Sequence, residues 1–162
     1  MLNQNSKPFA QIQYFIKAGM FREAIITYSK LRDGVTNESE LLSDKFFQRD
    51  LKEAEYSLIK LVRDQIQDIH RLMERNDIRY AFARCMQLVE ILDVEPTRRY
   101  FTEYLYELHE LLEQLNNERR AEQGIYEIQR LVEHHELNKA IHQLQILRDE
   151  VHPRSRFRRE IE

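Results

Sequence analysis

Glycine, proline and tryptophan are scarce in this chain of 162 residues, which has three glycines, three prolines and no tryptophan. Folds made mainly of β-sheet need many turn residues, so this scarcity excludes a turn-rich sandwich or barrel. Hydrophobic residues make up 42% of the chain, and together with the low glycine and proline content this argues against intrinsic disorder. The sequence is therefore rich in charged and apolar residues and poor in turn residues. Because this composition is typical of helical proteins, we expect an all-α fold.

A single cysteine, Cys85, excludes an internal disulfide framework and a metal cluster built on several cysteines. The net charge of -3 implies no general attraction to nucleic acid or anionic membranes, so neither is an expected partner. No apolar run approaches the roughly 20 residues that span a bilayer, and the N-terminus lacks the basic and apolar segments of a signal peptide. We therefore expect a cytoplasmic protein.

Apolar residues are present in a pattern that recurs three times. The three segments align on Ala24, Ala81 and Ala140, which lie 57 and 59 residues apart. The matching apolar positions, in chain order within each segment, are Ile12, Ile69 and Ile128; Phe15, Leu72 and Leu131; Ile16, Met73 and Val132; Phe21, Ile78 and Leu137; Ile25, Phe82 and Ile141; Tyr28, Cys85 and Leu144; Leu31, Leu88 and Leu147. These positions are expected to form one elongated core.

Each segment also has a short turn between its two helical runs, at residues 18–20, 75–77 and 134–136. Gly19 and Asn76 tolerate the left-handed conformation that ends a helix, whereas His135 fits it less well. The alanine five residues later allows two helix backbones to approach closely. Amphipathic helices match whenever they are phased alike, but phasing alone would preserve neither the turn nor the alanine. We therefore predict three helical hairpins, at about residues 8–33, 65–93 and 121–150.

The run GMFREAIITY resembles the second half of a tetratricopeptide motif, through Gly19, Phe21, Ala24 and Tyr28. The likeness is weaker at the corresponding positions of the second segment and weaker again in the third. Tetratricopeptide units recur every 34 residues, whereas these segments recur every 57 to 59. The resemblance implies a divergent array of helical hairpins that binds other proteins.

The extra length between the hairpins is predicted to consist of long connecting helices at residues 37–75 and 96–135. Asn37, with Glu40 three residues later, is a candidate N-terminal cap for the first, and Pro96 suits the first turn of the second. The apolar spacing changes register at residues 116–120, which indicates a bend, an exposed middle or a short loop, and we favour a continuous or kinked helix. The expected architecture is an elongated array of antiparallel helices, in which hairpins alternate with long helices.

The last segment, residues 151–162, matches residues 94–105, where the preceding long helix is expected to begin. A further long helix is therefore predicted to start here. This pattern favours one helical domain over residues 1–162 that is the N-terminal part of a longer protein, with a natural end as the alternative.

No motif for chemistry emerges from the sequence. The three glycines stand apart and form no phosphate-binding loop, and no nucleophile, base and orienting acid can be assembled. His70 with Glu74 and His109 with Glu113 are four residues apart, but no third metal ligand is implied. Cys85 stands where the other segments have Tyr28 and Leu144, which predicts a buried apolar role. We expect no cofactor, no metal and no enzyme activity within this segment.

Six arginines near aromatic residues are candidates for contact with an anionic partner such as a phosphorylated protein, lipid head groups or RNA. They are Arg98, Arg99, Arg154, Arg156, Arg158 and Arg159. The alternative is a set of solvated arginines near helix starts, where positive charge opposes the helix dipole.

Two further interpretations stand beside the main hypothesis of a non-catalytic scaffold that binds another protein. The run FREAIITYSKLRDG resembles the opening helices of accessory domains in bacterial glycosyltransferases that build surface polysaccharides. In that case the partner is a downstream domain of the same protein. Alternatively, apolar seams at residues 51–73 and 101–115 predict a homo-oligomer.

Overall fold

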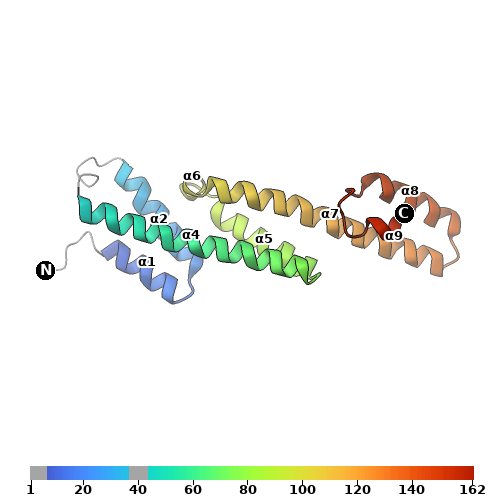
Figure 1. Ribbon diagram of the computed structural model, residues 1–162, viewed down its shortest axis with the longest axis horizontal. Coiled ribbons are helices and arrows are strands. Elements are labelled where there is room, and N and C mark those ends of the chain that lie inside the picture. Colours follow the sequence, from blue (N-terminus) through green and yellow to red (C-terminus); the bar gives the residue numbers. More distant parts are fainter. Residues whose placement is uncertain (1–6, 37–43) are drawn as a thin grey trace.

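The computed structural model describes residues 7–36 and 44–162, and the fold of this part is all-α (Figure 1). Its helices are α1 (Lys7–Lys17), α2 (Phe21–Thr36), α4 (Lys45–Glu74), α5 (Ile78–Leu92), α6 (Thr97–Tyr100), α7 (Thr102–Glu133), α8 (Leu137–Glu150) and α9 (Arg158–Ile161).

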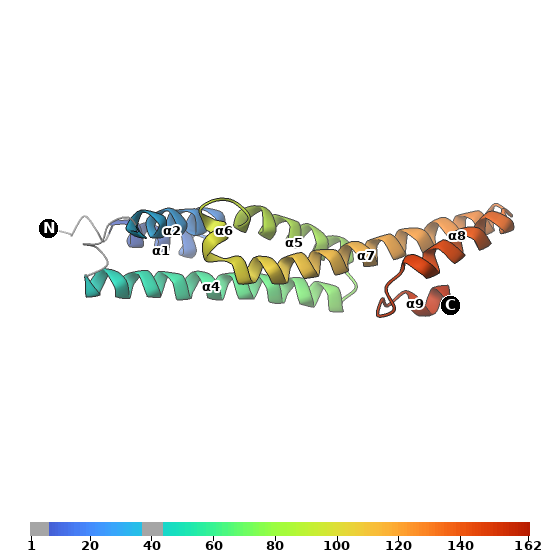
Figure 2. The ribbon, with the colours of Figure 1, turned by 90° about the horizontal axis from the view of Figure 1, so that it is seen from above.

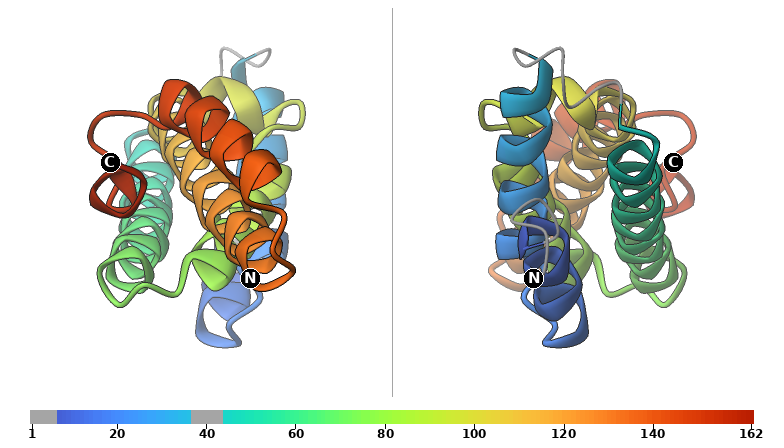
Figure 3. Two further views of the ribbon diagram at one scale, coloured as in Figure 1. Left: turned by 90° about the vertical axis from the view of Figure 1, so that its right-hand side faces the viewer. Right: turned by 90° about the vertical axis from the view of Figure 1, so that its left-hand side faces the viewer.

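The helices lie along one long axis, and the two longest, α4 and α7, follow each other along it (Figures 1 and 2). The most extensive contacts join α1 with α2, α5 with α7, and α7 with α8, and α4 also packs along α5. Seen from the two ends of the axis, α4 lies on the opposite flank from α2 (Figure 3). Each long helix therefore packs against the preceding pair with its first half and forms a pair of its own with its second half.

The three turns have the same backbone geometry. Gly19, Asn76 and His135 all have positive φ, at 71°, 71° and 60°. In each turn the amide after this residue donates to the carbonyl five residues back, over 2.8 to 2.9 Å, which satisfies an otherwise unpaired carbonyl at the helix end. His135 adopts this left-handed conformation although histidine tolerates it less well than glycine or asparagine.

Exchanging the residue types at these turns should change stability in opposite directions. Gly19→Ala is expected to lower the free energy of unfolding by about 1 kcal/mol, because a Cβ disfavours positive φ, although no atom lies within 4 Å to clash with it. His135→Gly is expected to raise it by about 0.5–1 kcal/mol for the converse reason. Urea unfolding measures both, and equal signs for the two variants would contradict the shared geometry.

The three aligned alanines are buried. Ala24 and Ala81 have no exposed surface and Ala140 is 4% exposed. Each lies in the first two turns of the second helix of its pair, close to the reversal of the chain. A methyl side chain there leaves room for the paired helix, as the sequence suggests.

The long helices begin later than the sequence predicted. Helix α4 starts at Lys45, where the Asp44 carboxylate accepts a hydrogen bond from the amide of Phe46 at 2.9 Å and caps the helix. The predicted cap of Asn37 and Glu40 lies outside the described residues.

The prediction of one helix over residues 96–135 is wrong at its start. Pro96 precedes α6, and the chain leaves helical geometry at Phe101, where φ is -124° and ψ is 24°. The Phe101 side chain is buried against the ring of Tyr28, with centroids 6.2 Å apart, so the break turns this aromatic ring into the core. Beyond Phe101, α7 is helical throughout, including residues 116–120.

The apolar side chains form two separate clusters in the described part of the chain, which corrects the prediction of one elongated core. The larger cluster extends from Phe9 to Leu115 and joins α1, α2, α4, α5 and the first half of α7. The smaller cluster is built around Ala121, Leu147 and Ile161. Between them along α7 lies Glu118, a charged residue that is only 8% exposed. Within the described residues, no helix has the length and apolar character needed to cross a membrane.

Candidate interaction surfaces

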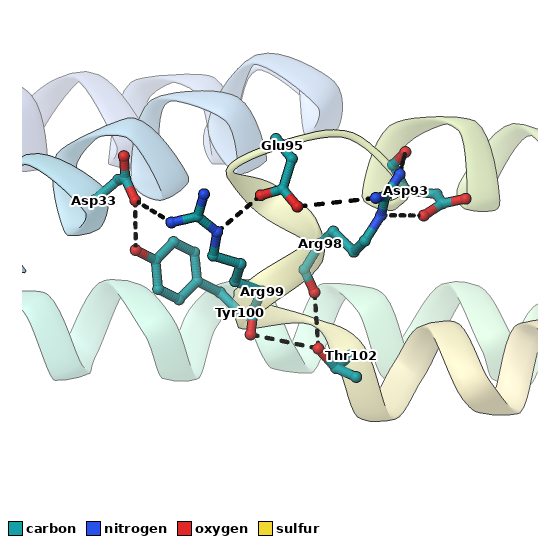
Figure 4. A network of polar contacts seen from close by, with 7 residues as sticks. All are labelled: Asp33, Asp93, Glu95, Arg98, Arg99, Tyr100 and Thr102. Carbon is teal, nitrogen blue, oxygen red and sulfur yellow. Dashed lines mark hydrogen bonds and ion pairs between the residues drawn. The ribbon is translucent and has the colours of Figure 1, made fainter.

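Arg98 and Arg99 lie on α6 in a network of polar contacts that joins α6 to α2 (Figure 4). Arg99 donates to Glu95 at 2.9 Å and to Asp33 of α2 at 3.2 Å. Arg98 donates to the carboxylate of Asp93 at 2.6 Å. Both arginines are more than half exposed, so each ion pair contributes little stability. The network nevertheless neutralises both guanidinium groups within the chain.

The same junction holds Arg32 on α2. It donates to the Tyr28 hydroxyl at 2.8 Å and to Glu55 of α4 at 2.9 Å, and its guanidinium lies 4.7 Å from the ring centre of Tyr100. Burial raises the pKa of the Tyr28 hydroxyl to about 12, an effect that the contact with Arg32 partly opposes. Helices α2, α4 and α6 are thus connected by polar as well as apolar contacts.

The other four candidate arginines lie at the far end of the molecule, around α9 (Figure 1). Arg158 pairs with Glu162 at 3.0 Å and donates to the carbonyl of Arg148 at 2.6 Å. Arg156 lies 3.4 Å from Glu118 of α7. Arg154 and Arg159 are exposed, and neither side chain has a carboxylate partner among the described residues.

The structure therefore does not bring the six arginines together, and four of them have carboxylate partners within the chain. An anion would have to compete with these carboxylates, which favours the interpretation of solvated, internally paired arginines. A contact with an anionic partner stays a prediction.

Cys85 is buried, as its place in the pattern predicted, and its thiol donates to the carbonyl of Leu108 on α7 at 3.3 Å. Burial raises the pKa of this thiol from 9.0 to about 11. Because the thiolate is the reactive form, such a cysteine is a poor nucleophile at neutral pH.

We expect Cys85 to resist a thiol reagent such as Ellman's reagent at pH 8 in the folded protein and to react within seconds in 6 M guanidinium chloride. The folded-state pKa lies above the ordinary value of 9.0, so the thiol's contribution to stability is complete below pH 9.0 and is lost as the pH rises through about 11. Rapid labelling of the folded protein at pH 8 would contradict the buried position.

A hollow of about 590 Å³ lies between α7 and the segment before α9, next to Glu118. It is lined by Glu110, Glu113, Gln114, Asn117, Glu118, His152, Arg154 and Ser155. Sequence reasoning missed the role of Glu118, because residues 116–120 contain only polar side chains and nothing local distinguishes the buried one.

Over the described ranges, no group of three or more histidine, cysteine or acidic side chains could hold a metal ion.

Apolar side chains that the sequence assigned to the core are exposed on the third pair of helices. Val132, Leu137 and Ile141 are 48%, 56% and 56% exposed, and we call these three residues the α7–α8 face. Their counterparts in the first two pairs are all buried or half-buried; they are Ile16, Phe21 and Ile25, and Met73, Ile78 and Phe82. The prediction that all matching positions are core is therefore wrong for these three residues of the third pair, because no described helix covers this part of it.

The comparisons with known proteins give no relative for this chain: no family model, curated protein or solved structure matches it.

Proposed function

We propose that this chain is a non-catalytic, tetratricopeptide-like scaffold that binds another protein in the cytoplasm. The observation that carries the proposal is the α7–α8 face, where three large apolar side chains of one helical pair are each about half exposed. Two of them, Leu137 and Ile141, lie four residues apart and so share one side of α8. Isolated apolar residues on a surface are ordinary, but a group on one face is typical of a binding site for another protein.

The arrangement of the helices supports the same function. The three left-handed turns share one geometry, and consecutive pairs build an extended surface, as in helical repeat proteins that bind partners along their length. Elsewhere the exposed aromatic residues, such as Tyr56, Tyr80 and Tyr106, lie on different helices. The α7–α8 face is therefore the surface that we assign to binding.

A photo-crosslinking amino acid placed at Ile141 in the full chain, expressed in its native cells, tests this function. We expect an adduct with one different polypeptide, identifiable by mass spectrometry. The same crosslinker at Tyr56, which is 72% exposed on α4, is the matched control and should give no such adduct. An adduct with a second copy of the chain would replace the proposal by homo-oligomerisation, and equal adducts at both positions would reject the α7–α8 face as the binding site.

A further inference from the structure

The hollow of about 590 Å³ between α7 and the segment before α9 has two walls of different chemistry. The α7 wall is made of polar side chains, most of them three or four residues apart and so on one side of the helix: Glu110, Glu113, Gln114, Asn117 and Glu118. The other wall belongs to the turn that follows α8, and its residues are His152, Arg154 and Ser155. Carboxylates of one segment and a guanidinium of another therefore line the same hollow.

Two of the lining residues, Glu118 and Ser155, are each only 8% exposed. One oxygen of the Glu118 carboxylate has no hydrogen-bond partner among the described residues, although Arg156 lies 3.4 Å from it. The Ser155 oxygen accepts a hydrogen bond from the amide of Phe157 at 3.2 Å, which leaves the hydroxyl hydrogen without an acceptor in the described part of the chain. Buried polar groups are normally hydrogen-bonded, so these two indicate that a polar molecule completes the hollow.

The wall formed by the turn is rich in hydrogen-bond donors. The Nδ1 atom of His152 accepts a hydrogen bond from the amide of Arg154 at 3.1 Å, so the proton of the neutral ring is on Nε2 and can be donated. The Arg154 guanidinium is exposed and pairs with no carboxylate of the described residues. Together with the Ser155 hydroxyl, these groups form a set of donors that suits a carboxylate.

The α7 wall suits positive charge. Glu118 is paired with Arg156, whereas Glu110 and Glu113 are exposed and have no cationic partner among the residues that the structure describes. Within those residues no group of three or more acidic or histidine side chains could hold a metal ion, which favours an organic cation. Side chains three residues apart on a helix have Cβ atoms ~5–6 Å apart. Two cationic groups joined by a short carbon chain can therefore each meet one of the two carboxylates.

We propose that this hollow binds a free basic amino acid, of the class of L-arginine and L-lysine. Its carboxylate accepts hydrogen bonds from His152, Arg154 and Ser155. Its two positive groups pair with Glu110 and Glu113, so the charges of the ligand balance two glutamates and one arginine. The hollow shares no residue with the α7–α8 face and is a second, separate binding site.

A titration of the isotope-labelled 162-residue chain with L-arginine, followed through its amide resonances by NMR, tests this site. Concentrations up to about 10 mM cover millimolar affinity. We expect saturable shifts at residues 110–118 and 152–155. Agmatine, which lacks the carboxylate, and L-citrulline, whose side chain is uncharged, should each bind about tenfold more weakly or worse, because each loses charge-assisted hydrogen bonds.

Variants of the full chain complete the test. Arg154→Ala should weaken L-arginine binding about tenfold or more. Arg159→Ala is its matched control, because Arg159 is also exposed but does not line the hollow. Glu113→Gln should weaken binding as well, whereas Glu122→Gln, at an exposed position of α7 outside this hollow, should not. Circular dichroism confirms that each variant keeps its helices.

The absence of shifts over this concentration range, or shifts confined to other parts of the chain, would overturn the inference. Equal affinities for L-arginine and agmatine would reject the carboxylate contact and with it an amino acid as the ligand. Equal effects of Arg154→Ala and Arg159→Ala would show a general electrostatic attraction in place of a defined site.

Discussion

Phe101→Ala is expected to lower the free energy of unfolding by about 3–5 kcal/mol, the usual cost of truncating a buried aromatic side chain. The Phe101 ring is 1% exposed and lies 6.2 Å from the ring of Tyr28 and 6.4 Å from that of Tyr104. It therefore connects α2 of the first pair to the start of α7. Removing it leaves a cavity where the chain breaks its helical geometry between α6 and α7 and buries this ring.

Tyr106→Ala provides the matched control for this change. Tyr106 lies five residues further on, in α7, and is 73% exposed, so its loss should change stability by at most about 0.5 kcal/mol. Both variants can be compared by guanidinium unfolding followed by circular dichroism. If Phe101→Ala cost no more than Tyr106→Ala, the described packing of α6 between α2 and α7 would be incorrect.

Arg156→Ala should lower the free energy of unfolding by about 3 kcal/mol, at the low end of the range for breaking a buried ion pair. The Arg156 side chain is 27% exposed and its partner Glu118 only 10%. Without Arg156, the Glu118 carboxylate remains buried and unpaired in α7. The stacking of the guanidinium on the Phe157 ring, at 4.2 Å, is lost as well.

The geometry of this pair leads to a second, less usual expectation. The Arg156 guanidinium nitrogens and one Glu118 oxygen have no hydrogen-bond partner among the described residues, so the pair does not recover its full desolvation cost. Replacing both residues, as Glu118→Leu with Arg156→Leu, should therefore give a stability within about 1 kcal/mol of the original chain or above it. Arg154→Ala, at an exposed arginine two residues away, is the control and should be neutral. A double variant as unstable as Arg156→Ala would contradict this account.

The sequence alone was sufficient to predict those features that depend on neighbouring residues in the chain. The 3.6-residue spacing of apolar side chains and the lack of turn residues predict helices, and the fold is all-α. Gly19 and Asn76 indicate two of the three turns, because few residue types accept positive φ. The burial of Cys85 followed from its place in the apolar pattern.

Features that depend on contacts between distant segments were missed. Phe101 leaves the helix because its ring packs against Tyr28, which lies far away in sequence. Glu118 is buried because Arg156 and the segment before α9 cover it. In the sequence, the six candidate arginines are distinguished only by their charge. Their separation into one group on α6 and another around α9 could not be predicted from it.

Periodic apolar residues determine that a helix has one side that avoids water, and this was enough to establish the helices and the turns between them. They do not determine what lies opposite that side. Ile25 and Ile141 stand at the same position of the pattern, yet Ile25 is fully buried and Ile141 is 56% exposed. The difference arises because another helix of the chain packs on the pair that contains Ile25, whereas none of the described helices covers Ile141. Only the tertiary structure separates core from surface here, since burial is a property of the neighbours and the hydrophobic pattern is a property of the residue alone.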